Sequence, residues 1–128
     1  MHLLVSTPGM SNAPFTCGLS AALAVVGGKW KPLIIYFLLQ EKRRYGALKR
    51  AIAEVSDKML IQQLKELVDD GVVIRDDHAE IPPRVEYSLT PFGVSLAQAL
   101  ATLCAWGEQH AERVGIIVAA RERGAAKR

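Results

Sequence analysis

The segment LKRAIAEVSDKMLIQQLKEL, residues 48–67, decides the fold. It predicts two short helices, over residues 46–53 and 57–70, that are joined by a tight turn. Ser56 is typical of a helix N-cap, because its hydroxyl can accept a hydrogen bond from an unpaired N–H of the first turn. Apolar side chains that recur at helical spacing are the predicted core positions: Leu48, Ile52, Leu60, Leu64 and Leu67. This arrangement indicates a helix-turn-helix, whose second helix enters the major groove of DNA.

Further elements on both sides complete a winged helix-turn-helix. Upstream we expect one helix over residues 17–26 and an almost wholly apolar one from about Lys31. Downstream the pattern predicts two strands that form a hairpin with a projecting tip, at residues 72–75 and 85–89. Thr90 then caps a last helix, which we expect to run unbroken from Pro91 past His110. The predicted fold class is therefore mainly α with a small β-hairpin.

The length of 128 residues predicts one compact domain, which we place at residues 15–120. Residues 1–14 show no sustained periodicity and are expected to form a flexible arm, and residues 121–128 a basic tail that frays. The longest apolar run, residues 32–39, is far shorter than a membrane span. The N-terminus lacks the features of a signal peptide. We therefore expect a cytoplasmic protein without a membrane partner.

Positive charge is concentrated in one part of the chain. Residues 29–58 carry eight basic and three acidic side chains, a net charge of +5, against +3 for the whole chain. Such a zone is typical of a protein that binds a polyanion. The two cysteines, Cys17 and Cys104, are not spaced as zinc ligands, and no nucleophile triad or phosphate-binding loop is present. We expect no metal, no cofactor and no enzymatic activity.

The outward face of the predicted helix 57–70 carries side chains that can read DNA. Gln62 can bond adenine through N6 and N7, and Lys58 can reach guanine or a phosphate. Ser56 can contact a base edge or a phosphate. Further phosphate or minor-groove contacts are expected from Arg44, Lys49, Lys65 and Arg84, and from Tyr45, whose alternative role is packing. The alternative function is a winged-helix module that binds proteins, because any amphipathic helix shows a polar outer face.

Several strings carry a resemblance over residues 17–107: CGL (17–19), GGKW (27–30), RYGAL (44–48), SDKML (56–60), LKELVDDGVV (64–73), IPPRVEYSLTPFG (81–93) and WG (106–107). Together they resemble the HxlR-type regulators, relatives of the MarR winged-helix repressors. Many members have proline after the N-terminal cysteine, where this chain has Gly18. That departure bears on where the first helix starts and, with it, on the setting of the thiol.

The resemblance implies a homodimer that binds double-stranded DNA, with the first and last helices building the dimer. The expected interface residues are Leu19, Leu96, Leu100 and Leu103. It also implies a role for Cys17, since oxidant- and electrophile-sensing members carry their reactive thiol there. A helix N-terminus lowers a thiol's pKa and favours the thiolate that reacts. The alternatives are a Cys17 that only packs, and a regulator that responds instead to a small effector held between the dimer helices.

Overall fold

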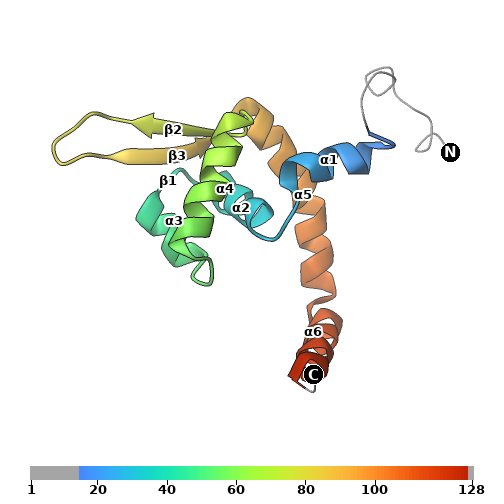
Figure 1. Cartoon of the computed structure of the whole chain (residues 1–128). Helices are drawn as coiled ribbons and strands as arrows, with labels where there is room; N and C mark the ends of the chain where they lie inside the picture. Colours follow the sequence, from blue (N-terminus) through green and yellow to red (C-terminus); the bar gives the residue numbers. More distant parts are fainter. Residues whose placement is uncertain (1–14, 127–128) are drawn as a thin grey trace.

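The computed structural model describes residues 15–126 and has a winged-helix architecture (Figure 1). The elements in chain order are α1 (Gly18–Val26), α2 (Trp30–Gln40), β1 (Arg43–Arg44), α3 (Tyr45–Ala51), α4 (Asp57–Asp69), β2 (Val73–Asp77), β3 (Val85–Leu89), α5 (Pro91–Gln109) and α6 (Ala111–Ala126). The strands form one antiparallel sheet in the order β1-β3-β2. The predicted hairpin is therefore confirmed, and β1 adds a third strand to it. The N-terminal arm predicted at residues 1–14 lies outside the described residues.

The core is built on α2, which packs against α3, α4, α5 and β3. Its Ile34 and Ile35 are fully buried. The five core positions predicted for the helix-turn-helix are all buried, which confirms that prediction. Truncating one of them, such as Leu60, to alanine would cost about 2–5 kcal/mol, because a buried leucine leaves a cavity behind.

The two ends of α4 are set by local chemistry. At the start, Ser56 Oγ accepts a hydrogen bond from the backbone N of Met59 at 3.1 Å, so the predicted N-cap is confirmed. At the end, Gly71 adopts a positive φ of 74°, a conformation that glycine reaches without a steric penalty. These signals fix the helix length and therefore which side chains it presents outward.

A tight corner joins the wing to α5. Thr90 Oγ1 donates to the carbonyl of Gly71 at 2.6 Å and accepts from the backbone N of Gly93 at 2.9 Å. A Cβ added at Gly93 would lie 2.2 Å from the carbonyl oxygen of Val72, so only glycine fits this crossing. The corner anchors the base of the wing against the first turn of α5.

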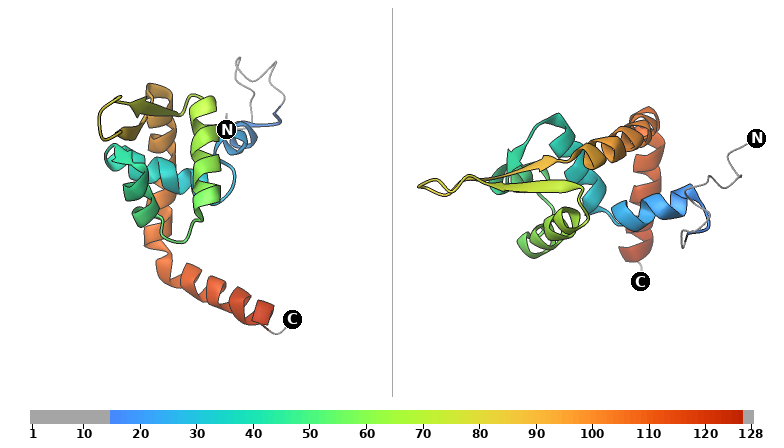
Figure 2. Two further views of the ribbon diagram at one scale, coloured as in Figure 1. Left: turned by 60° about the vertical axis from the view of Figure 1, so that its left-hand side comes forward. Right: turned by 90° about the horizontal axis from the view of Figure 1, so that it is seen from above.

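The last helix differs from the prediction of one unbroken helix. α5 ends at Gln109, and His110 has φ −116° and ψ 18°, which no longer continues an α-helix. The His110 ring stacks on Trp106 at 4.6 Å and its Nδ1 lies 2.9 Å from the Trp106 carbonyl oxygen. Apolar spacing runs across this point, so periodicity could not reveal the break. α6 turns away from the axis of α5 (Figure 2) and is helical as far as Ala126, which corrects the expectation of fraying from residue 121.

Among residues 15–126, no single helix has the length and hydropathy needed to cross a membrane. α1 and α2 reach them only as a pair, and the chain bends by 82° between the two.

Candidate nucleic-acid interface

The outer face of α4 carries the predicted recognition residues. Lys58, Gln62 and Lys65 are exposed, while the opposite side of the same helix is buried in the core. Sequence reasoning missed Ile61, which is 58% exposed between them. Its signal is an apolar residue outside the buried stripe, and an apolar side chain there can contact a thymine methyl group. The helix therefore presents hydrogen-bonding, charged and apolar groups side by side.

Ion pairs within the protein compensate part of the positive charge of residues 29–58. Three of its eight cations have a carboxylate partner: Lys29 with Glu54 at 3.6 Å, Lys31 with Glu66 at 3.0 Å and Arg43 with Glu41 at 3.8 Å. In the part of the chain that the structure describes, the other five have none: Lys42, Arg44, Lys49, Arg50 and Lys58. These five lie on β1, α3 and the first turn of α4 or beside them, so the uncompensated charge gathers next to the recognition helix.

Two of the predicted phosphate contacts sit before or on α3. Arg44 is exposed on β1, directly ahead of α3. Lys49 is half-buried, with Nζ 3.5 Å from the carbonyl oxygen of Ala53. Both positions suit contacts to the backbone that flanks a groove, where charge positions a protein without reading sequence.

Tyr45 has its hydroxyl engaged inside the protein. The hydroxyl donates a short hydrogen bond to Asp57, in the first turn of α4. Burial, followed by this bond to a carboxylate, raises the pKa of Tyr45 to about 12. A phenol has one proton to donate, so the geometry favours the packing alternative over a phosphate contact. Tyr45 joins the start of α3 to the start of α4.

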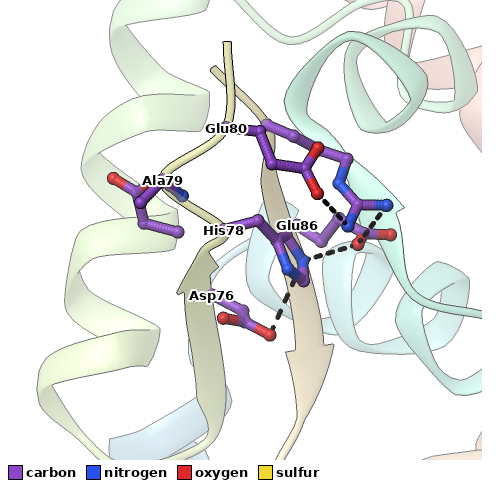
Figure 3. Close-up of polar contacts among 7 residues, drawn as sticks. Asp76, His78, Ala79, Glu80 and Glu86 are labelled. Atoms are coloured by element: carbon purple, nitrogen blue, oxygen red, sulfur yellow. Dashed lines mark hydrogen bonds and ion pairs between the residues drawn. The ribbon is translucent and has the colours of Figure 1, made fainter. Parts of the chain in front are cut away.

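Charged side chains of the wing form a network of ion pairs (Figure 3). Arg84 lies 3.0 Å from Glu80 and 3.7 Å from Glu86. His78 Nε2 lies 2.7 Å from the same Glu86 and 3.6 Å from Asp76. Residues 73–89 carry two arginines and four carboxylates, a net charge of −2 with His78 neutral. The guanidinium expected to reach DNA is therefore neutralised within the wing.

Cys17 caps the first helix. Its Sγ accepts from the backbone N of Ser20 at 3.5 Å, and the side chain is exposed. This bond is the main cause that lowers the pKa of the Cys17 thiol from its usual value. The helix starts at Gly18, so glycine in place of proline leaves the thiol at the helix N-terminus. Cys104 is half-buried, with Sγ 3.7 Å from Glu108.

The four predicted interface leucines do not share one environment. Leu19 and Leu103 are 68% and 64% exposed, whereas Leu96 and Leu100 pack against the core. Leu100 and Leu103 line a mostly apolar groove of about 260 Å³ between α2 and α5. Other large apolar side chains are exposed on α1, α5 and α6: Leu23, Trp106, Ile116, Ile117 and Val118. Residues 15–126 contain no group of His, Cys, Asp or Glu side chains arranged for a metal ion.

The two helices α3 and α4 on a buried stripe, the basic flank and the hairpin wing together make up a winged helix-turn-helix, the fold of transcriptional regulators. The chain belongs to the HxlR-like helix-turn-helix family, which it matches over residues 25–114.

Individual relatives agree with this assignment. The chain is 46% identical over 99 residues to the uncharacterized HTH-type transcriptional regulator YkvN of Bacillus subtilis (strain 168). The matched segment covers 77% of this chain and 84% of that protein. The redox regulator HypR in its oxidized form is 39% identical, with a TM-score of 0.70 over 73% of this chain and 96% of that one. Diamide-treated YodB from B. subtilis is 33% identical, with a TM-score of 0.62 over 73% and 93% of the two chains.

Proposed function

We propose that the protein is a homodimer that binds a pseudo-palindromic operator sequence-specifically, with α4 in the major groove. The observation that carries this proposal is the exposed row of Lys58, Gln62 and Lys65 on a helix whose other side is fixed in the core. Side chains on a rigid helix meet base edges in a defined register, which is what sequence readout requires.

The roles follow from chemistry and position. Gln62 reads adenine, and Lys58 contacts guanine or a phosphate. Ser56 uses its oxygen as the helix cap, and its hydroxyl proton remains available for a phosphate. Lys65, Arg44 and Lys49 bind phosphates and fix the register of the protein on the duplex.

The dimer is supported by apolar surface on the helices at both ends of the chain. Leu19 on α1, Leu103 on α5 and Ile116 on α6 are each more than half exposed. Pairing about a two-fold axis would remove such surface from water. It would also place two copies of α4 about 34 Å apart, one turn of DNA, on matching half-sites.

A redox response through Cys17 is the second part of the proposal. Its support is the exposed thiol at the N-terminus of α1 with a lowered pKa, together with the likeness to HypR and YodB. The thiolate attacks a peroxide oxygen, which yields a sulfenic acid and releases hydroxide or alkoxide. A second thiol then displaces water to form a disulfide. That thiol is the partner copy's Cys17 or a small cellular thiol. A shift in α1 would change the spacing of the two recognition helices.

DNA binding is tested by fluorescence anisotropy on the DNA upstream of the protein's own gene and on a scrambled duplex. We expect the upstream duplex to bind at least about 100-fold more tightly, with an affinity that falls steeply as salt rises. Arg121→Ala on α6 serves as a control that removes a distant positive charge without effect. Equal affinity for both duplexes would favour the protein-interaction alternative.

The redox part is tested on the native protein, Cys17→Ser and Cys104→Ser. Operator affinity is measured before oxidation, after mild diamide or peroxide, and after dithiothreitol. The proposal requires a reversible change in the native protein that Cys17→Ser lacks. An identical response of all three proteins would make Cys17 a packing residue and move the signal elsewhere, for instance to a small effector.

A further inference from the structure

Polar contacts to other elements hold α4 near both of its ends. Near its C-terminal end, Glu66 pairs with Lys31 of α2 at 3.0 Å. At its first residue, Asp57 accepts the hydrogen bond from Tyr45 of α3. None of these four side chains belongs to the outward row of Lys58, Gln62 and Lys65.

Lys31 is the one buried charged residue in the described part of the chain, with 9% of its surface exposed. Glu66 receives a second contact from Gln63 Nε2 at 3.5 Å. Desolvating a lysine is costly unless a carboxylate compensates it. The pair therefore ties the first turn of α2 to α4 in one geometry. Lys31 is too deeply buried to reach a nucleic acid itself.

Close packing of the buried stripe holds α4 against the core. Directional contacts add a restraint on small shifts of the helix along its own axis, because their energy depends on the separation and angle of particular atoms. An ion pair at one end and a hydrogen bond at the other both lengthen when the helix slides. Base readout needs donors and acceptors within a few tenths of an ångström of their ideal separation.

We infer that Lys31 and Tyr45 are positioning residues for DNA recognition. They act through Glu66 and Asp57 to set the axial position of α4, and hence the register of Lys58 and Gln62 on the bases. This inference rests on the proposed function, and it goes beyond that function by assigning specificity to residues that do not touch DNA.

The central test measures the ratio of affinities for the cognate and scrambled duplexes, at a temperature where circular dichroism shows every variant folded. Lys31→Met/Glu66→Gln removes both charges, so no unpaired carboxylate remains near the DNA. We expect the ratio to fall about tenfold, the worth of one base contact, while scrambled-duplex affinity and the salt slope stay unchanged. The reversed pair Lys31→Glu/Glu66→Lys should restore most of the ratio.

The neighbouring ion pair supplies the matched control. Lys29 and Glu54 lie 3.6 Å apart but are largely exposed, so Lys29→Met/Glu54→Gln should leave the ratio unchanged. If native protein discriminates and the Lys31/Glu66 double variant discriminates equally well, the inference is overturned and the proposed function stands. If native protein itself shows no preference between the duplexes, sequence-specific binding is refuted, and the inference that rests on it is refuted as well. A reduced salt slope would instead mean a direct phosphate contact and would also overturn the inference.

Tyr45 is tested by a double-mutant cycle with Asp57. If Tyr45 acts through Asp57, Tyr45→Phe lowers the affinity ratio about threefold in the native background and has no further effect on Asp57→Ala. A direct phosphate contact predicts the same loss in both backgrounds, and that result would remove Tyr45 from the inference.

The pH dependence of stability provides a readout for the Lys31–Glu66 contact. The Lys31 ammonium, by hydrogen bond and by charge, lowers the pKa of Glu66 below its usual value. A carboxyl with a depressed folded-state pKa contributes stability that is present above its unfolded pKa and lost as pH falls through the folded pKa. The difference in unfolding free energy between native protein and Lys31→Met should therefore shrink as pH falls through that window. A difference that is constant with pH would show that the pair is not formed in solution.

Discussion

The recognition helix and the wing are neighbours in the chain, yet they present opposite electrostatic faces. Lys58 and Lys65 of α4 pair with no carboxylate among residues 15–126. Arg84 of the wing has carboxylates on two sides, from Glu80 and Glu86. A cation in a candidate DNA-binding element is available to a phosphate only when the protein has not already compensated it.

This difference predicts that α4 and the wing contribute unequally to the affinity for DNA. The exposed cations near α4 attract the phosphate backbone, and releasing counterions there contributes to affinity. The wing, with its net charge of −2, gains little from approaching a phosphate. We therefore expect α4 and its flank to dominate binding, with the wing contributing a small share.

The largest expected effect comes from separating the two copies of α4. Leu103→Glu places a charge on an exposed leucine of α5, where the proposed dimer would bury it. A single copy without a strong wing contact should bind the palindrome at least about 100-fold more weakly, because both half-sites are needed. Light scattering measures the oligomeric state, and anisotropy measures the affinity for the palindrome. Gln98→Glu, at another exposed position of α5, is the matched control. A monomer that still binds tightly would mean that the wing supplies the affinity expected from the second copy of α4.

The second prediction compares the loss of one cation from α4 with the loss of one cation from the wing. Lys58→Gln and Arg84→Gln each remove a single positive charge from the chain. We expect Lys58→Gln to weaken operator binding about tenfold or more, and Arg84→Gln by less than about threefold. Anisotropy titrations at two salt concentrations check both values. Equal losses would show that Arg84 leaves its carboxylates when DNA binds.

A smaller effect should appear when the wing is made less acidic. Glu86→Gln removes the carboxylate that lies 2.7 Å from His78 and 3.7 Å from Arg84. Arg84 keeps its closer partner Glu80, and the reduced negative charge of the wing should raise affinity about two- to threefold and make the salt dependence steeper by up to one phosphate contact. Binding to a scrambled duplex is the most direct readout, since this effect carries no sequence information. Weaker binding with the fold intact would mean that the network positions Arg84 for DNA.

A structural feature could be predicted from the sequence when the residues that determine it lie close together in the chain. The helix-turn-helix, its N-cap and the outward row of α4 follow from spacing and capping within a few residues, and the structure has them where they were predicted. The break at His110 is not predicted, because a change of backbone dihedrals at one residue leaves the apolar periodicity intact. Lys31 was counted as part of a basic surface, although it is buried against Glu66, 35 positions away. Such a pair becomes visible only when two helices are packed together.

Substitution of Gln62 distinguishes base reading by α4 from base reading by the wing. The measurement is the affinity of native protein, Gln62→Ala and Arg84→Gln for a set of operators that carry every single-base change in one half-site. If α4 reads the bases, Gln62→Ala loses discrimination at one A·T position, by about 1–3 kcal/mol, and keeps it elsewhere, while Arg84→Gln keeps the native profile. A native profile in Gln62→Ala, with discrimination lost instead in Arg84→Gln, would contradict base reading by α4 and assign sequence recognition to the wing.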